Sequence, residues 1–295
     1  MGEAAGYVIV SPVKDEGAYI ERTISSVRRQ TVLPSVWVLV DDGSCDQTPE
    51  IMSHHAAEVE WIRTLRLGGG AKREPGSGVI RAFSAGYASI RHLAYKFVVK
   101  LDCDLEFGPE YFESLLSRFS EDACLGIASG MYWEQENDKW SPVRMPGYHA
   151  AGAAKMVRRE CFEQIGGFVP SRGWDTVDEI RAQVSGWRTK HFEDLRLLHL
   201  KREGSGIGNV RTSKMAGEIY YLTGGGPLFF GLKCFHHLVT GRPPIVGAAA
   251  MFLGYCSPLI RRRARLVSGT ELQHYRRLLN QRILAGVGLS RVSEH

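Results

Sequence analysis

The sequence has 295 residues, 44% of them hydrophobic and 23% charged, with a formal net charge of +5. This balance excludes a disordered chain, and the length allows one large domain or two ordinary ones. The charge is uneven, because residues 201–295 carry +10 and residues 1–199 carry −5, which indicates cation-dependent chemistry in the acidic part and an anionic partner for the basic part.

Strands and helices alternate in the first hundred residues. Apolar runs predict strands at Tyr7–Val10, Val36–Val40, Val59–Leu65 and Phe97–Leu101. Helical patterns lie between them, at residues 16–30, 46–55 and 79–93. This alternation predicts an α/β fold with a mostly parallel central sheet flanked by helices. In such sheets ligands bind at the carboxyl ends of the strands, which is where Asp41, Asp42, Asp102 and Asp104 fall.

The pattern of residues 125–200 is mixed. It predicts strands at Leu125–Met131, Thr189–Phe192 and Leu195–His199, and helices at Arg158–Ile165 and Asp175–Val184. After a flexible stretch at Gly204–Gly208 the chain becomes apolar and basic. We therefore expect one domain over residues 1–203, in two parts at about 7–105 and 106–203, followed by a basic helical extension over 204–295.

Two acidic motifs carry the strongest chemical signal. Asp102-Cys103-Asp104 ends a strand and places two carboxylates where they can share a hard divalent cation. Val40-Asp41-Asp42-Gly43-Ser44 ends another strand with carboxylates that can meet a nucleobase edge or a ribose. Taken singly, the first motif is also typical of a solvated turn. The second is also typical of the start of a helix capped by Ser44 or Asp46.

A third acidic segment, Trp174-Asp175-Thr176-Val177-Asp178-Glu179, lies at a junction between a loop and a helix. A carboxylate held at such a junction can remove a proton from an acceptor hydroxyl. The alternative is an ordinary acid-rich first turn, which the helix dipole stabilises.

Together these motifs resemble the family-two inverting nucleotide-sugar glycosyltransferases of the GT-A fold, over residues 7 to about 200. Residues 11–16 are similar to the opening loop of that family, with Asp15 where the family usually has Asn. Residues 40–48 resemble its nucleotide-binding motif, residues 76–86 its Gly-rich loop and helix, and residues 102–104 its metal-binding Asp-x-Asp. Residues 158–168 resemble the acceptor-side signature that precedes the catalytic acid.

The resemblance implies that residues 1–203 are a catalytic domain, with a nucleotide-binding half at about 7–105 and an acceptor half at about 106–203. It also implies a role for each matching position. The residues expected to bind the nucleotide are Pro12, Val13, Asp15, Glu16, Asp41, Asp42, Gly78, Arg81 and Asp102. Lys72 and Arg73 are alternatives to Arg81 for neutralising the diphosphate. The residues expected to hold the metal, Mn²⁺ or Mg²⁺, are Asp104, Asp102 and His199, although a lone histidine at a strand end is as often structural. Gly152 and Trp174 are expected on the acceptor side.

Asp175 is the expected catalytic base, with Asp178 or Glu179 as the alternative. The family usually has Glu-Asp where this sequence has Trp174-Asp175, and an Asp where it has Val177. The resemblance implies one in-line displacement that transfers a single sugar from a nucleotide-sugar, expected to be a UDP-sugar, with inversion at the anomeric carbon. A nucleotidyltransferase that forms sugar nucleotides, or a non-catalytic nucleotide-binding adaptor, remains an alternative.

The basic tail contains an uncharged run of 18 residues, Pro243–Ile260, followed by Arg261-Arg262-Arg263-Ala264-Arg265. The run is too short and too rich in Pro and Gly to span a bilayer. We expect residues 229–265 to bind an anionic membrane surface, which places the protein on the cytoplasmic side as a peripheral or monotopic protein with a polyprenyl-diphosphate-linked acceptor. The alternative is a small helical subdomain that packs on the catalytic one. No nucleic-acid motif is present, so no nucleic-acid partner is expected.

The six cysteines are scattered and form no CxxC pair, which favours neither a disulfide framework nor a zinc site. A reducing cytosol is the simplest expectation. Residues 1–6 are too short and too acidic for a secretory signal.

Overall fold

The computed structural model describes residues 6–68, 76–136, 138–201, 208–241 and 243–286. The chain divides into two compact units, residues 1–202 and residues 203–295. Residues 204–207 of the predicted flexible stretch lie outside the described residues.

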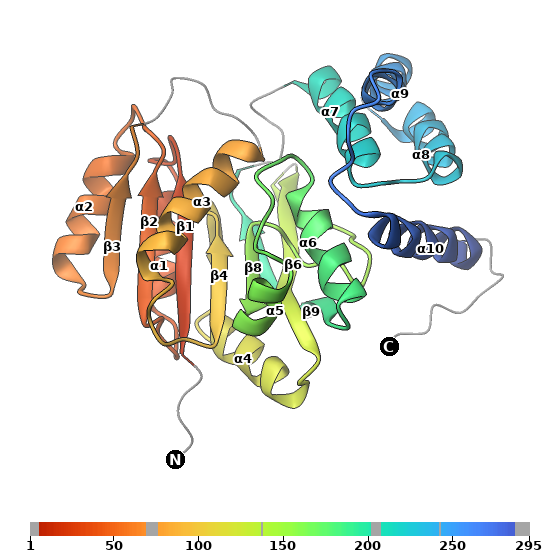
Figure 1. The fold of residues 1–295 in the computed structure, drawn as a ribbon. Helices are drawn as coiled ribbons and strands as arrows, with labels where there is room; N and C mark the ends of the chain where they lie inside the picture. Colours follow the sequence, from red (N-terminus) through yellow and green to blue (C-terminus); the bar gives the residue numbers. More distant parts are fainter. Residues whose placement is uncertain (1–5, 69–75, 137, 202–207, 242, 287–295) are drawn as a thin grey trace. The chain divides into compact units, whose positions relative to one another are not determined.

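The described part of the first unit holds a nine-stranded sheet flanked by helices (Figure 1). Its strands are β1 (Tyr7–Val13), β2 (Val36–Asp41), β3 (Ile62–Arg66), β4 (Phe97–Leu101), β5 (Leu105–Phe107), β6 (Leu125–Glu136), β7 (Lys139–Pro142), β8 (Ala154–Arg158) and β9 (Arg188–His199). Their order is β3-β2-β1-β4-β8-β6-β9-β5, with β7 paired to β6. The α/β class is confirmed. Parallel pairing joins β3, β2, β1 and β4, and also β6 and β9, whereas the other pairs are antiparallel.

Six helices cover the two faces of this sheet in the described residues of the first unit. They are α1 (Ile20–Arg28), α2 (Thr48–Glu58), α3 (Ser77–Ile90), α4 (Tyr111–Glu121), α5 (Arg159–Gln164) and α6 (Trp174–Val184). Alternate residues of a strand point to opposite faces. Ile9 of β1 therefore packs in one core with α1, α2 and α4, while Val8 and Val10 pack in a second core with α3, α5 and α6. The double-sided burial explains why the strands are continuous apolar runs.

The structure corrects several predicted elements. The two strand pieces predicted at residues 189–192 and 195–199 form one strand, β9, whose pairing with β6 shifts between Gly130 and Met131. The sequence patterns did not predict β5, β7, β8 or α4. In β8 the buried Lys155 interrupts the apolar run that would predict a strand. This lysine can be buried there because partners from elsewhere in the chain stabilise its charge.

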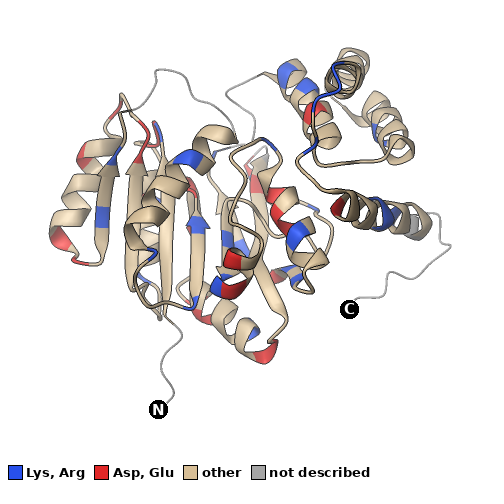
Figure 2. Ribbon diagram, viewed as in Figure 1, with Lys and Arg blue, Asp and Glu red and all other residues tan. Residues whose placement is uncertain are grey.

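The described part of the second unit is helical, with α7 (Asn209–Leu222), α8 (Pro227–Thr240), α9 (Pro244–Ile260) and α10 (Gly269–Gly286). The helix expected within the uncharged run is α9. In the ribbon of Figure 2 these helices carry several blue Lys and Arg positions, and their red acidic positions are Glu218 and Glu271. Among the residues that the structure describes, none of the helices is both long enough and apolar enough to cross a membrane.

Candidate active site

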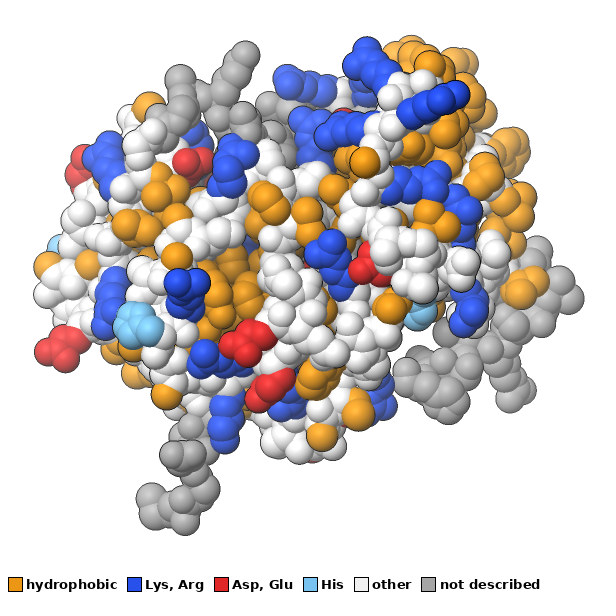
Figure 3. Space-filling model, in the orientation of Figure 1, with side chains coloured by type: hydrophobic (Ala, Val, Ile, Leu, Met, Phe, Trp, Pro, Cys, Tyr) orange, Lys and Arg blue, Asp and Glu red, His pale blue; other side chains and the backbone are white. Residues whose placement is uncertain are grey.

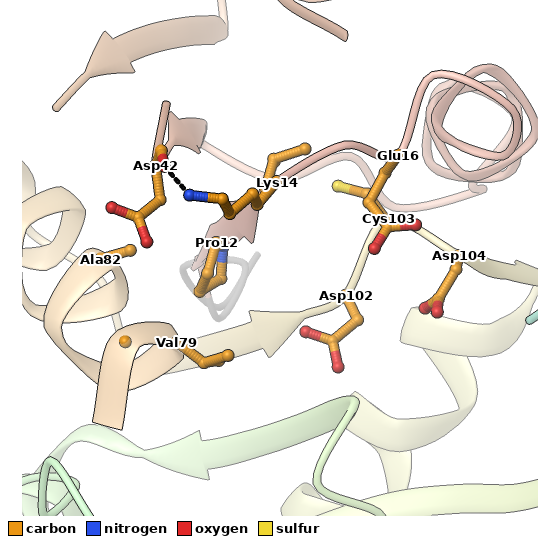
Figure 4. Close-up of a pocket in the computed structure, with 11 residues that line it drawn as sticks. Pro12, Lys14, Glu16, Asp42, Val79, Ala82, Asp102, Cys103 and Asp104 are labelled. Carbon is orange, nitrogen blue, oxygen red and sulfur yellow. Dashed lines mark hydrogen bonds between the residues drawn. The ribbon is translucent and has the colours of Figure 1, made fainter. Parts of the chain in front are cut away.

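A pocket lies at the carboxyl ends of β1, β2 and β4, beside the start of α3 (Figure 4). It has an empty volume of about 550 Å³, which includes the space open to solvent. The residues that line it are Pro12, Val13, Lys14, Glu16, Asp42, Gly78, Val79, Ala82, Asp102, Cys103 and Asp104. Seven of the predicted site residues are therefore brought together by the meeting of parallel strand ends.

Asp15 and Asp41 do not line this pocket. The Asp15 carboxylate accepts a hydrogen bond from the backbone N–H of Cys45 at 2.8 Å, and the Asp15 N–H donates to Ser44 Oγ at 2.9 Å. Asp41 is buried, and its Oδ1 accepts a hydrogen bond from the Ser44 N–H at 2.8 Å. Asp15 thus holds the two pocket loops together and Asp41 closes the turn at residues 41–44, which positions Asp42 and Glu16 for a ligand.

The expected diphosphate-binding cations are only partly placed. Arg81 is an exposed residue of α3 and is not among the residues that line the pocket. Lys72 and Arg73 lie outside the described residues. Lys14, which was not predicted, does line the pocket, and its ammonium donates a hydrogen bond to the backbone carbonyl of Asp42 at 2.9 Å (Figure 4).

Asp102 lies in the pocket wall beside Lys100. The Lys100 ammonium donates to Asp102 Oδ1 at 2.6 Å, and the lysine side chain is only 3% exposed. Burial raises the pKa of Asp102 above its ordinary value, the charge of Lys100 opposes this shift, and the negative charge of Asp104 adds to it. Lys100 lies on β4 and Asp102 follows the last residue of that strand, two positions further on, so the two side chains are close enough to pair.

His199 lies beside Asp104 because β5 and β9 are antiparallel neighbours, with Leu105 opposite His199. His199 Nε2 is 3.3 Å from Asp104 Oδ2, and its Nδ1 is 3.3 Å from Glu134 Oε1. Burial lowers the pKa of His199, but the hydrogen bond and charge of Asp104 outweigh this effect and raise the pKa to about 9. The predicted proximity of this histidine to the Asp-x-Asp motif thus has a structural basis.

The acidic end of the pocket fits a divalent cation that shares its ligands with a substrate. Asp104 Oδ1 is buried and has no hydrogen-bond partner among the described residues, so an acceptor is available there. Within the described ranges, no three His, Cys, Asp or Glu side chains are grouped closely enough to hold a metal by themselves. A site of one or two carboxylates completed by phosphate oxygens and water is the arrangement that Mg²⁺ prefers.

Asp175 begins α6 in a partly buried position next to Gly152. A Cβ atom added at Gly152 would lie 3.3 Å from Asp175 Cβ and 3.5 Å from Asp175 Oδ2. The next residue, Ala153, accepts a hydrogen bond from the Asp102 N–H at 2.7 Å. Backbone contacts therefore connect Asp175 to the Asp102 end of the pocket, and the small Gly152 leaves room above the carboxylate.

Trp174 is buried next to two lysines, with Lys100 Nζ and Lys155 Nζ each 5.3 Å from the centroid of its ring. Lys100 contacts Asp102, and Lys155 donates to the backbone carbonyl of Asp175 at 2.9 Å. The indole ring, at a position where the family usually has Glu, is attracted to both ammonium groups through its negative face.

Asp178 and Glu179 are engaged in a buried charge network. Lys155 Nζ lies 3.0 Å from both carboxylate oxygens of Asp178 and 3.1 Å from Glu179 Oε1, and His149 Nδ1 lies 2.9 Å from Glu179 Oε2. Burial raises the pKa of Asp178 to about 7, opposed by Lys155 and assisted by Glu179. Burial also opposes ionisation of Glu179, but His149 and Lys155 outweigh it and lower the pKa. Burial by itself lowers the pKa of His149, but the charge and hydrogen bond of Glu179 outweigh burial, so the pKa is raised.

Sequence reasoning missed several residues of the site. Lys14 lies within the opening loop and Cys103 within the Asp-x-Asp motif, so the sequence alone could have placed both residues near the pocket. Lys201 was not detectable in this way. Its ammonium donates to both carboxylate oxygens of Glu16, at 2.9 and 3.1 Å, from a position 185 residues away.

Comparisons with known proteins agree with this fold. The chain matches the mannosyltransferase PcManGT from Pyrobaculum calidifontis, solved with GDP-Man and Mn²⁺, with a TM-score of 0.57 and 16% identity, covering 96% of this chain and 86% of that one. It also matches GalNAc-T7, solved with UDP, GalNAc and Mn²⁺, with a TM-score of 0.62 and 14% identity, covering 98% of this chain and 59% of that one. At these identities the likeness shows the fold, which is the GT-A glycosyltransferase fold.

Sequence similarity gives the family. The chain is 24% identical over 243 residues to an N-acetylglucosaminyl-diphospho-decaprenol L-rhamnosyltransferase of Mycobacterium tuberculosis, covering 67% of this chain and 77% of the relative. The family described as glycosyl transferase family 2 matches residues 8–174. Because this match covers more than half of the chain, the protein belongs to glycosyl transferase family 2 and is a glycosyltransferase.

Proposed function

We propose that this enzyme is a metal-dependent, inverting transferase that moves one sugar from a nucleotide-sugar to an acceptor hydroxyl. The observation that carries the proposal is the pocket, in which Asp42 and Lys14 lie at one end and Asp102 and Asp104 at the other (Figure 4). A nucleoside diphosphate has the same polarity, with a hydrogen-bonding base and ribose at one end and a charged diphosphate at the other.

The nucleoside is placed at the Asp42 end, between the opening loop and the start of α3. The Asp42 carboxylate is an acceptor for a ribose hydroxyl or a base N–H. The diphosphate is placed beside Asp102 and Asp104, with His199 next to Asp104. Asp104 and Asp102 would hold a divalent cation, which would stabilise the negative charge that develops on the leaving diphosphate.

Asp175 is proposed as the base that takes the proton of the acceptor hydroxyl. Its side chain is partly exposed next to Gly152, whereas the side chains of Asp178 and Glu179 are 1% and 3% exposed and paired with Lys155. A buried, paired carboxylate cannot reach an acceptor without breaking its ion pair, so these two alternatives are disfavoured. A single displacement from the face opposite the leaving group inverts the anomeric configuration and needs no covalent intermediate.

The donor is proposed to be a UDP-sugar of the hexosyl or N-acetylhexosaminyl class, and the acceptor a polyprenyl-diphosphate-linked glycan of a surface polysaccharide or glycoconjugate. The name of the Mycobacterium tuberculosis relative describes a rhamnosyltransferase for such a lipid-linked acceptor, and GalNAc-T7 was solved with UDP. An acceptor of this kind resides in a membrane. We therefore propose that the enzyme works on the cytoplasmic side of the bilayer, attached peripherally or monotopically through residues 229–265.

The experiment is a donor screen by thermal shift with Mn²⁺ present, followed by assay of nucleoside diphosphate release. A bound donor stabilises the folded state by mass action, so binding at 100 times Kd adds about 2.7 kcal/mol. Asp104→Asn is expected to remove the Mn²⁺-dependent part of donor binding. Asp175→Asn is expected to retain donor binding and to lower kcat by 10²- to 10⁴-fold.

The matched control is Asp194→Asn, an exposed carboxylate that does not line the pocket. If Asp175→Asn keeps full activity, the assignment of the base is wrong. Pyrophosphate release from a nucleoside triphosphate would indicate a nucleotidyltransferase instead. Nucleotide binding without turnover toward any lipid-linked acceptor would indicate an adaptor.

A further inference from the structure

Helix α9 has one outward face that is entirely apolar. Its exposed large side chains recur at helical spacing and are between 45% and 79% exposed. They are Ile245, Val246, Phe252, Leu253, Leu259 and Ile260. No charged residue occurs anywhere between Pro244 and Ile260. An exposed helix face in water ordinarily carries polar residues, so this face is unusual.

Helix α8 adds a second group of exposed apolar side chains, which are Leu228, Leu232, Phe235, Leu238 and Val239. Among the residues described, these two consecutive helices contribute eleven of the fifteen exposed large hydrophobic side chains. Figure 3 shows hydrophobic side chains gathered over α8 and α9, with basic side chains beside them. Single exposed hydrophobic residues are normal, but a concentration of this size indicates a binding surface. We call these eleven side chains the apolar face.

Helix α9 cannot rotate to bury this face, because α7 holds its other side at very short range. A Cβ atom at Gly217 of α7 would lie 1.9 Å from the Met251 carbonyl oxygen, and one at Gly254 of α9 would lie 2.0 Å from the Lys214 carbonyl oxygen. Tyr255, also on the inner side, stacks on Phe230 with ring centroids 4.2 Å apart. The described helices of the second unit therefore do not bury the apolar face among themselves.

The charges next to the apolar face are basic. Arg261, Arg262, Arg263 and Arg265 follow the last residue of α9 directly, and the first three are exposed. The described part of the second unit contains only two acidic residues, Glu218 and Glu271. An apolar surface bordered by cations, with few anions nearby, is complementary to the acyl chains and anionic headgroups of a phospholipid surface.

We infer that the apolar face inserts into the outer part of an anionic bilayer leaflet, with the arginines at the level of the lipid phosphates. The inference rests on the proposed function and identifies the partner of its C-terminal unit. Helix α9 has 17 residues, about 26 Å at 1.5 Å per residue, and is shorter than the roughly 30 Å hydrocarbon core. Helix α9 therefore inserts shallowly and does not cross the bilayer. The enzyme then reaches the lipid-linked acceptor from the leaflet to which it is attached.

The test is flotation of the protein with two kinds of vesicles. One kind is phosphatidylcholine alone, and the other is phosphatidylcholine with about 30 mol% phosphatidylglycerol. The negative surface of the second kind attracts basic side chains within ~1 Debye length. The wild-type protein is expected to float with the anionic vesicles and to bind them less at high salt. The double variant Phe252→Gln/Leu253→Gln is expected to reduce binding at least tenfold. Arg261→Gln/Arg262→Gln is expected to remove the preference for anionic lipid while retaining part of the binding.

The matched control is Leu33→Gln, a 48% exposed leucine in the first unit, which is expected to float like the wild type. Unchanged binding of the Phe252→Gln/Leu253→Gln variant would overturn the inference. A shift of that variant from dimer to monomer in light scattering would assign the face to a second copy of the chain. A fall in its melting temperature without an effect on flotation would assign the face to an intramolecular contact.

The proposed transferase activity is measured separately with a short-chain, water-soluble acceptor. If the apolar face binds membrane, the Phe252→Gln/Leu253→Gln variant keeps this activity and loses only flotation. If the function proposal fails, no sugar is transferred but flotation is unaffected. The two failures are therefore distinguishable.

Discussion

Lys155 is the residue whose removal tests the buried charge network most directly. Its side chain has no exposed area and pairs with Asp178 and Glu179, whose side chains are 1% and 3% exposed. Lys155→Met replaces the lysine with an apolar side chain of similar length and leaves two buried carboxylates without their shared cation. Breaking a buried ion pair in this way costs about 3–5 kcal/mol of unfolding free energy.

The cost is expected to depend on pH. Burial raises the pKa of Asp178 to about 7, above its value of about 3.9 in the unfolded chain. Between about pH 4 and pH 7 the folded state keeps a proton on Asp178 that the unfolded state releases. The contribution of Asp178 to the free energy of unfolding therefore falls as the pH rises through this range. Without Lys155 the folded state retains this proton above pH 7. The additional destabilisation of the variant therefore grows by about 1.4 kcal/mol between pH 6 and pH 8.

Urea denaturation at pH 6 and pH 8, followed by tryptophan fluorescence, measures this effect. All six tryptophans lie between residues 37 and 187, so their signal reports the first unit alone. The matched control is Lys190→Met at an exposed lysine, which is expected to change stability by less than about 0.5 kcal/mol. The double variant Lys155→Met/Asp178→Asn is expected to recover stability and to lose most of the added pH dependence. A loss below about 1 kcal/mol for Lys155→Met, or an equal loss at both pH values, would refute the reasoning.

Three further substitutions test packing and positioning. Gly86→Ala is expected to cost about 1–3 kcal/mol in urea denaturation, because its Cβ would lie 2.5 Å from Val40 Cγ2; an unchanged midpoint would contradict this. Gly254→Ala is expected to separate α7 from α9, since its Cβ would lie 2.0 Å from the Lys214 carbonyl oxygen, and far-ultraviolet circular dichroism should show earlier melting of helix. Trp174→Phe, which shrinks the ring next to Lys100 and Lys155, is expected to lower kcat more than donor affinity in steady-state assays, and a pure loss of affinity would argue against its role in positioning Asp175.

Local pattern predicted most of the first half of the fold. Apolar runs such as those of β1, β2 and β4 identify strands because each is buried on both faces and so carries no polar side chain inside the sheet. The acidic motifs follow these strands directly in the sequence. Since parallel strands end at one edge of a sheet, Asp42, Asp102 and Asp104 had to lie near one another once the strands were recognised.

The sequence motifs did not separate residues that contact the pocket from residues that shape it. Asp41 and Asp42 are adjacent, yet Asp41 accepts the hydrogen bond of a turn while Asp42 lines the pocket. The difference arises because successive residues at a strand end point to opposite sides. Asp15 is likewise used to join two loops, through Ser44 and Cys45, which are 29 and 30 residues away.

The sequence by itself determined the α/β class, the carboxylates at the strand ends and the uncharged helix beside an arginine cluster, because these follow from neighbouring residues and short periods. Only the tertiary structure decided which acid of α6 is available, since Asp178 and Glu179 are held by Lys155 from β8, and His149 reaches Glu179 from a loop. It also brought His199 to Asp104 through the pairing of β5 with β9. Pairing of this kind depends on how the whole chain packs, which no local pattern encodes.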